Sequence, residues 1–174
     1  MREEVNVTIR EAIPEDAQEL LAVTKIIGAE TDFLVMDEEG MALEAYELAF
    51  QLDRLYESPN NVLFVAFVDE KMVGVASIRA ESKFRMAHIG EVGLSILQEY
   101  WGIGLGSLLM DELILWSEES QIIRRLELTV QQRNQRAVHL YEKFGFQTEG
   151  ILQRGARLDD GQFLDVQLMS LMID

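Results

Sequence analysis

The chain has 174 residues, of which 48% are hydrophobic, and it carries a formal net charge of −16 with no cysteine. This length favours one domain over residues 1–174 with a sizeable buried core. The charge argues against nucleic-acid binding, and the lack of cysteine excludes disulfides and thiolate metal sites. With only His88 and His139 as histidines, no metal site is expected. The apolar runs are too short for a membrane span, and the N-terminal M-R-E-E-V-N lacks the apolar stretch of a signal peptide. A cytoplasmic protein is therefore expected.

The N-terminal half is predicted to hold three strands and two helices. A strand over residues 5–10 precedes Pro14, which suits the first turn of a helix, and apolar residues at helical spacing follow to about residue 27. Residues 31–40 are expected to be a connector, and residues 41–56 a second amphipathic helix that ends at Ser58-Pro59. Apolar strands over 61–68 and 72–79, joined by Asp69-Glu70-Lys71, predict a hairpin.

The C-terminal half is predicted to begin with a strand over residues 87–97. It leads into a loop with Gly102, Gly104 and Gly106, and a leucine-rich helix then extends to about Glu119. A strand over 122–130 and a helix over 134–144 follow, and strands over 149–158 and 163–172 flank a turn at 159–161. The strand–helix–strand crossover predicts a parallel strand pair. The expected fold is an α/β mixed sheet, mostly antiparallel, with helices on both faces.

The segment from Ser95 to Leu109 carries the most informative functional signal. A strand that feeds a glycine loop into a helix directs several backbone N–H groups and the positive end of the helix dipole to one point, which is typical of phosphate sites. The spacing fits neither a P-loop (G-x-x-x-x-G-K-S/T) nor the dinucleotide pattern G-x-G-x-x-G. A tight turn without a ligand is the alternative.

A second motif, N-Q-R-A-V-H-L-Y-E-K-F-G-F, runs from Asn134 to Phe146 after the strand L-E-L-T-V. Together, the two motifs resemble the GNAT superfamily of acetyl-CoA-dependent N-acetyltransferases, and the last two strands resemble its ribosomal-protein and polyamine acetyltransferase branch. The resemblance covers nearly the whole chain. It implies a single N-acetyltransferase domain whose two parallel strands splay apart around the pantetheine. One departure is Trp101, which stands where the family usually has Gln or Arg.

The resemblance also implies which residues bind acetyl-CoA. The glycine loop should hold the pyrophosphate, and three residues of the preceding strand should offer backbone groups to the pantetheine. Asn134 also suits a helix N-cap, with Gly145 as the stop of the same helix. Arg136 and Lys143 are cations that could meet the ribose phosphate, the alternative being side chains that are only solvated. The full expected set is Leu94, Ser95, Ile96, Trp101, Gly102, Ile103, Gly104, Leu105, Gly106, Ser107, Asn134, Arg136 and Lys143.

Two residues are candidates for catalysis. Tyr141 matches the family's tyrosine that points at the cofactor sulfur, and a phenol can protonate a leaving thiolate; the alternative is a core tyrosine. Glu91 is the candidate base, since burial in a covered strand would raise its pKa; the alternative is a solvated or ion-paired carboxylate. With no cysteine for a covalent intermediate, we expect direct transfer in a ternary complex.

The acceptor is expected to be a cationic primary amine, either a small molecule (a polyamine or an amino-acid-like metabolite) or a protein N-terminus. Residues 1–70 hold 17 of the 31 acidic residues but only 4 of the 15 basic ones. Asp32 and Phe33, between the first two helices, are predicted to contact this substrate. A non-catalytic acyl-CoA sensor acting through a protein partner remains an alternative, as does a structural domain with an empty glycine turn. Exposed sheet edges leave a homodimer open.

Overall fold

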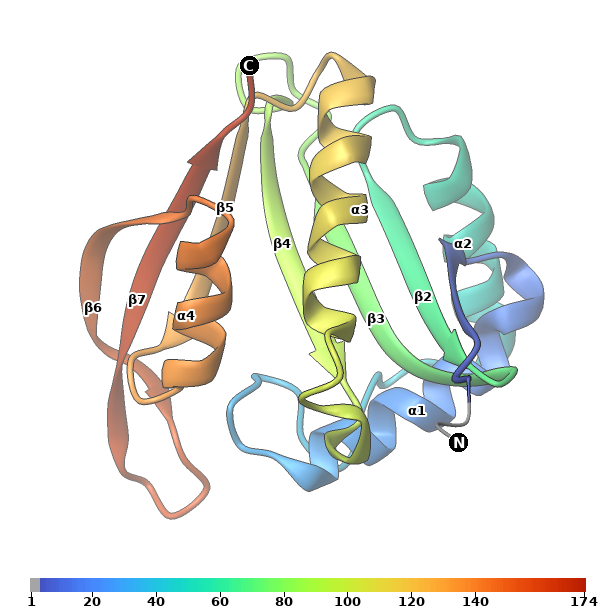
Figure 1. Ribbon diagram of the computed structural model, residues 1–174, viewed down its shortest axis with the longest axis horizontal. Helices are drawn as coiled ribbons and strands as arrows, with labels where there is room; N and C mark the ends of the chain where they lie inside the picture. The colour runs from blue at the N-terminus through green and yellow to red at the C-terminus, as the bar shows by residue number, and fades with distance from the viewer. Residues whose placement is uncertain (1–3) are drawn as a thin grey trace.

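One mixed sheet organises the computed structural model, which describes residues 4–174 (Figure 1). The first three residues of the N-terminal stretch M-R-E-E-V-N lie outside the described residues. The strand order is β1-β2-β3-β4-β5-β7-β6, and every neighbouring pair is antiparallel except β4 and β5. The strands are β1 (Val7–Glu11), β2 (Val62–Val68), β3 (Lys71–Arg79), β4 (Ile89–Ile96), β5 (Arg125–Gln131), β6 (Gln147–Arg157) and β7 (Phe163–Met172).

Two helices cover each face of the sheet, as predicted. α1 (Ala17–Glu30) and α2 (Ala45–Glu57) pack on one face, and α3 (Leu105–Ser120) and α4 (Gln135–Lys143) pack on the other (Figure 1). The second helix begins at Ala45, later than predicted, because the Glu44 N–H donates to the Glu47 carboxylate at 3.0 Å and caps the helix there. No helix within residues 4–174 combines the length and apolarity needed to cross a bilayer.

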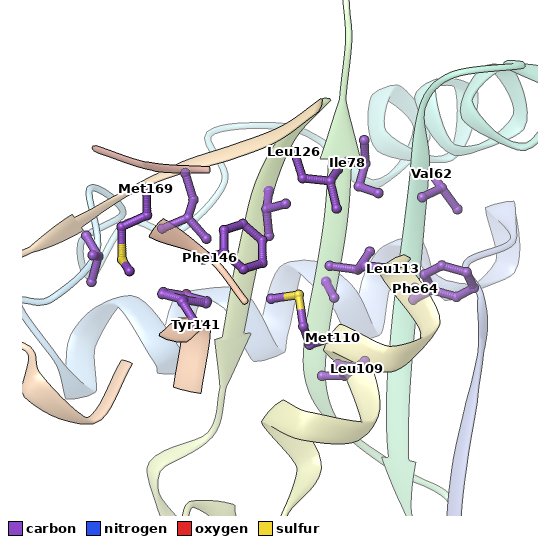
Figure 2. Close-up of a cluster of buried hydrophobic side chains, with 14 of the residues drawn as sticks. Val62, Phe64, Ile78, Leu109, Met110, Leu113, Leu126, Tyr141, Phe146 and Met169 are labelled. Carbon is purple, nitrogen blue, oxygen red and sulfur yellow. The ribbon is translucent and has the colours of Figure 1, made fainter. Parts of the chain in front are cut away.

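The alternation of side chains along β2 explains how one sheet supports two cores. Val62 and Phe64 point to the side of α3, where they join a cluster with Leu113 (Figure 2). Val65 points to the opposite side and packs with Leu52 of α2. Burial of each such side chain contributes roughly 1.5–3 kcal/mol. The core therefore fixes α3 against the sheet, and with it the loop that precedes the helix.

The parallel pairing of β4 and β5 is short. It comprises Ile89 with Arg125, Gly90 with Leu126, and Glu91 with Glu127. Beyond Glu91 the two strands diverge (Figure 1), while β4 stays paired with β3 as far as Ile96. The backbone groups of residues 92–96 that face β5 therefore lack a strand partner on that side, and the predicted splayed pair is confirmed.

Candidate active site

The glycine loop ends in a helix whose first backbone donors are free. Gly102 and Gly104 have φ values of +82° and +90°, which L residues rarely adopt, and Gly104 is the N-cap of α3. Leu108 is the first residue whose N–H bonds back into the helix, to the Gly104 carbonyl at 3.1 Å. The N–H groups of residues 105–107 have no helical acceptor and carry the positive end of the helix dipole. This arrangement suits an anion.

A cavity of about 720 Å³ extends from this loop along the splayed end of β4 to α4. Every residue expected to bind the cofactor lines it except Ile103, which is exposed. Asn134 is confirmed as the N-cap of α4, because its side chain accepts a hydrogen bond from the Ala137 N–H at 3.3 Å. Gly145, with φ +94°, follows the end of the same helix as predicted. The two motifs thus come together around one cavity, to which we refer as the cofactor cavity.

Two cations of α4 lie beside the glycine loop. The Arg136 guanidinium carbon lies 5.0 Å from the centre of the Trp101 ring, and the Trp101 Nε1–H donates to the Ile96 carbonyl at 2.8 Å. Lys143 Nζ donates to Ser107 Oγ at 3.3 Å. Although the loop lacks the usual Gln or Arg, these two side chains from α4 bring positive charge to the same place.

Tyr141 lies among the core side chains on the inner face of α4 and lines no cavity described here (Figure 2). Its ring centre is 5.8 Å from that of Phe146, and burial raises the pKa of Tyr141 to about 12. Ala137 and Leu140 of the same helix do line the cofactor cavity. The phenol is therefore protonated at neutral pH, but Tyr141 is not among the residues that line the cofactor cavity, and its role in catalysis stays a prediction.

Glu91 is exposed, so the expected burial of this carboxylate is wrong. The reason is that α1 packs on β3 and α2 on β2, and neither helix extends over β4 at this position. Glu91 lies beside Arg79 on β3 and Glu127 on β5 in the strand register, and it lines neither cavity. If it acts as a base, a water molecule has to relay the proton.

A second cavity of about 780 Å³ lies beside the first, between the α1–α2 connector (residues 31–44), the end of β5 and the β6–β7 hairpin. Thr31, Phe33, Leu34 and Trp101 line both cavities. Asp32 lines the second cavity, where its predicted contact with the substrate stays a prediction, and most of the other charged residues there are acidic. The charged lining residues are Glu30, Asp32, Asp37, Glu38, Arg157 and Asp159. We refer to this space as the acceptor cavity.

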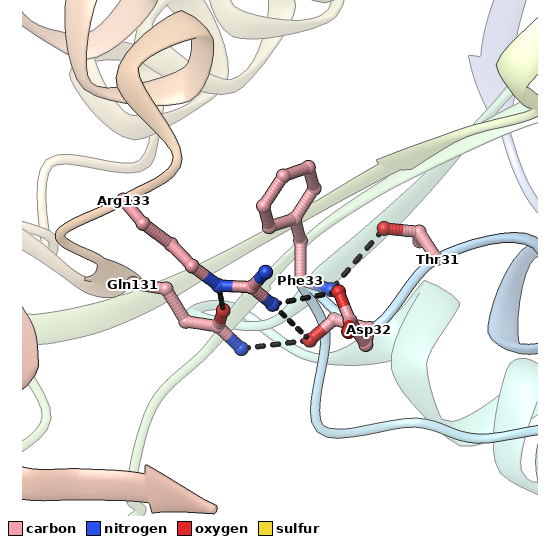
Figure 3. A network of polar contacts seen from close by, with 5 residues as sticks. All are labelled: Thr31, Asp32, Phe33, Gln131 and Arg133. Atoms are coloured by element: carbon pink, nitrogen blue, oxygen red, sulfur yellow. Dashed lines mark hydrogen bonds and ion pairs between the residues drawn. The ribbon is translucent and has the colours of Figure 1, made fainter. Parts of the chain in front are cut away.

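A polar network that the sequence did not predict joins the connector to the end of β5 (Figure 3). Arg133 Nη2 donates to Asp32 Oδ1 at 2.6 Å, and the buried Gln131 donates from Nε2 to the Asp32 carbonyl at 2.8 Å. In the sequence, Arg133 is only one of several cations between residues 120 and 145, and nothing singles out Gln131. Their partner lies about 100 residues earlier, and only the folded chain brings it near.

Comparisons with known proteins agree with this geometry. The family model described as acetyltransferase (GNAT) family matches residues 30–146. The L-amino acid N-acetyltransferase AaaT of Escherichia coli (strain K12) is 30% identical over 118 residues, which are 68% of this chain and 72% of that protein. A GNAT-family acetyltransferase from Streptococcus pneumoniae superposes with a TM-score of 0.95 at 45% identity, over 97% of this chain and 100% of that one. The yncA protein of Salmonella typhimurium, solved with its cofactor acetyl-CoA, has a TM-score of 0.83 at 18% identity, over 97% of this chain and 95% of that one, and shares the fold.

Proposed function

Because the chain belongs to the acetyltransferase (GNAT) family, as its two motifs predicted, we propose that it transfers the acetyl group of acetyl-CoA to a primary amine. The observation that carries this proposal is the pair of adjoining cavities at the gap between β4 and β5. One cavity ends at a helix N-terminus suited to a phosphate, and the other is lined by acidic side chains. Two substrates bound in these adjoining cavities would lie next to each other and could react directly, without a covalent enzyme intermediate.

The cofactor cavity has a distinct group for each part of coenzyme A. The N–H groups of residues 105–107 would bind the pyrophosphate, with Arg136 and Lys143 near its charge. The edge of β4 at Leu94–Ile96, which has no strand partner on the β5 side, would bond to the amides of the pantetheine, much as a strand would. Acetyl-CoA supplies an activated acetyl thioester. A backbone N–H of this edge would also stabilise the oxyanion that develops on the carbonyl.

Transfer requires three proton movements besides the attack of nitrogen on carbon. The acceptor ammonium has to lose a first proton before its nitrogen can attack, and the carbon–sulfur bond breaks to leave a thiolate that needs a second proton. The attacking nitrogen also releases a proton as the amide forms, and this third proton restores the donor of the second. We propose that Glu91 takes up the first proton through water, since this carboxylate is exposed to solvent. Tyr141 is the proposed donor of the second proton, because its phenol is protonated at neutral pH; the raised pKa makes it a weaker acid than a free phenol. Because Tyr141 is not among the residues that line the cofactor cavity, this assignment is the first to test.

The acceptor is proposed to be a cationic primary amine that binds in the acceptor cavity, where Asp32 and Phe33 are the residues first expected to contact it. The Escherichia coli relative acts on L-amino acids, and the acidic lining favours an acceptor with a positive charge besides the reacting amine. Polyamines, basic amino acids and the N-termini of peptides all meet this description.

A thiol-release assay over a panel of amines tests the proposal. The panel would contain spermidine, lysine, alanine, glutamate and N-terminal peptides, with calorimetry for CoA binding in parallel. We expect CoA to bind and free thiol to appear with cationic acceptors ahead of glutamate. Binding of acetyl-CoA without thiol release from any amine would favour the sensor function, and no heat with CoA would refute both.

A further inference from the structure

We propose that Arg133 is a positioning residue that pins the first part of the α1–α2 connector to the end of β5, and so sets the wall shared by the two cavities. Its effect on turnover rests on the proposed acetyl transfer, whereas the pin itself does not. The proposal follows from the contacts of Arg133, from the way the rest of the connector is held, and from the residues that form the wall.

Four hydrogen bonds close the pin (Figure 3), the longest of them from Arg133 Nη2 to the Asp32 carbonyl at 3.5 Å. Arg133 Nη2 donates to Asp32 Oδ1 at 2.6 Å, Arg133 Nε donates to Gln131 Oε1 at 2.8 Å, and Gln131 Nε2 donates to the Asp32 carbonyl at 2.8 Å. A planar guanidinium can bond in two directions at once with a fixed geometry. Arg133 therefore binds the connector directly and also orients the amide that binds it a second time.

The same guanidinium holds Phe33. The Arg133 guanidinium carbon lies 4.8 Å from the centre of the Phe33 ring, within the range of a cation–π interaction. Phe33 lines both cavities, with its neighbours Thr31 and Leu34. The position of this ring at the border of the two cavities thus depends on Arg133.

The later part of the connector is held in a different way. A Cβ atom added at Gly28 of α1 would lie 1.8 Å from the Asp37 carbonyl oxygen, and one added at Gly40 would lie 2.8 Å from the Lys25 Cα. Residues 37–40 therefore pack directly on the backbone of α1. Within residues 31–36, Leu34 and Met36 pack against the core, whereas Asp32 and Val35 are exposed. Loss of the pin should release residues 31–36 and leave residues 37–40 in place.

The two halves of the pin differ in strength. The side chains of Arg133 and Asp32 are 37% and 58% exposed, so their ion pair is partly screened by water and weak. Gln131 is only 7% exposed, and its amide loses its partner if the connector leaves. Loss of the Arg133–Asp32 ion pair should therefore loosen the connector, while the Gln131 amide still favours its bound position.

Hydrogen exchange of the protein alone tests the pin without any substrate. In Arg133→Ala and in Asp32→Ala, we expect exchange in residues 31–36 to quicken about fivefold or more through local opening, with no change in residues 37–40. Arg133→Lys keeps the charge but loses the fork, so it should recover part of the protection. Asp159→Asn is the matched control, since it removes another acidic group of the acceptor cavity without touching the pin, and its exchange should equal that of the wild type. Unchanged exchange in Arg133→Ala would overturn the proposal.

Arg133 also lines the cofactor cavity, so it could instead contact a phosphate of the cofactor directly. Kinetic and binding measurements distinguish this role from the positioning role. A pin predicts a higher acceptor KM in both single variants, an unchanged Kd for CoA, and a double variant no worse than either single one. A phosphate contact predicts weaker CoA binding in Arg133→Ala alone, which would contradict the assigned role. If no amine is acetylated, the proposed function fails while the exchange result still decides on the pin.

Discussion

Tyr141→Phe removes only the hydroxyl from the residue assigned as proton donor. The ring keeps its place against Phe146, so the free energy of unfolding at neutral pH should change by less than about 1 kcal/mol. CoA should bind as in the wild type, because Tyr141 does not line the cofactor cavity. If the phenol protonates the thiolate, kcat should fall about 100-fold.

The raised pKa of Tyr141 also predicts how the free energy of unfolding depends on pH. Burial shifts this pKa from 10.0 to about 12, so the folded protein holds the phenolic proton more tightly than the unfolded chain. The contribution to stability is complete below pH 10 and is lost as the pH rises through about 12. At about 1.36 kcal/mol per pKa unit, the wild type should lose about 3 kcal/mol more than Tyr141→Phe over that window. Denaturant titrations of both proteins across the window measure this difference.

Tyr100→Phe is the matched control for catalysis, because Tyr100 does line the cofactor cavity. Steady-state thiol release by the wild type and the two variants, with calorimetry for CoA, compares them directly. Equal turnover in Tyr141→Phe would refute its assignment as donor. Loss of turnover in Tyr100→Phe instead would assign the proton to the tyrosine that the cavity already exposes.

Three further predictions follow from single sites. Arg136→Ala should weaken CoA binding about fivefold, less at high salt, because it removes a cation beside the glycine loop; calorimetry at two salt concentrations measures both effects. Gly104→Ala forces a residue with a Cβ to φ +90° and should cost about 1–2 kcal/mol of unfolding free energy. In the control Gly150→Ala, an added Cβ meets nothing, and the unfolding free energy should change by less than about 0.5 kcal/mol. Equal losses of the two variants in denaturant titrations would contradict this. Asp16→Asn should cost about 1–3 kcal/mol, because the carboxylate accepts bonds from Arg10 at 2.7 and 2.9 Å. Since those bonds lower the pKa of Asp16, this advantage of the wild type should be present above pH 3.8 and disappear as the pH falls through the lowered pKa, which acid titration of unfolding checks.

The periodicity of the sequence predicted the strands and helices because the pattern of burial follows directly from it. The bounds of β7, residues 163–172, agree with the prediction, and α4 lies between its predicted cap at Asn134 and Phe144. The start of α2 was missed by four residues, since apolar spacing alone does not show which residue caps the helix. Here a pair of glutamates decides the helix start.

The sequence predicted those features of the site that depend on residues close together in the chain. The glycine loop and Asn134 act through their own backbone or near neighbours, so motif and structure agree. Glu91 was expected to be buried because its strand is apolar, with a solvated carboxylate as the alternative; the composition of the strand does not reveal whether a helix covers the face on which Glu91 lies. Helical spacing likewise put Tyr141 on an inner face without showing whether core or cavity lies opposite. The pairing of Arg133 with Asp32 spans the chain and has no local signature.

The brief contact between β4 and β5 divides the sheet into two panels that meet along only three residue pairs. A pantetheine bound in the opening would serve as a surrogate strand and tie the panels together. Any ligand that binds only the native form at 100 times its Kd adds about 2.7 kcal/mol to stability. On the proposed function, the resistance of this protein to heat and proteolysis would rise and fall with the supply of acetyl-CoA, so that metabolic state would regulate its abundance as well as its rate.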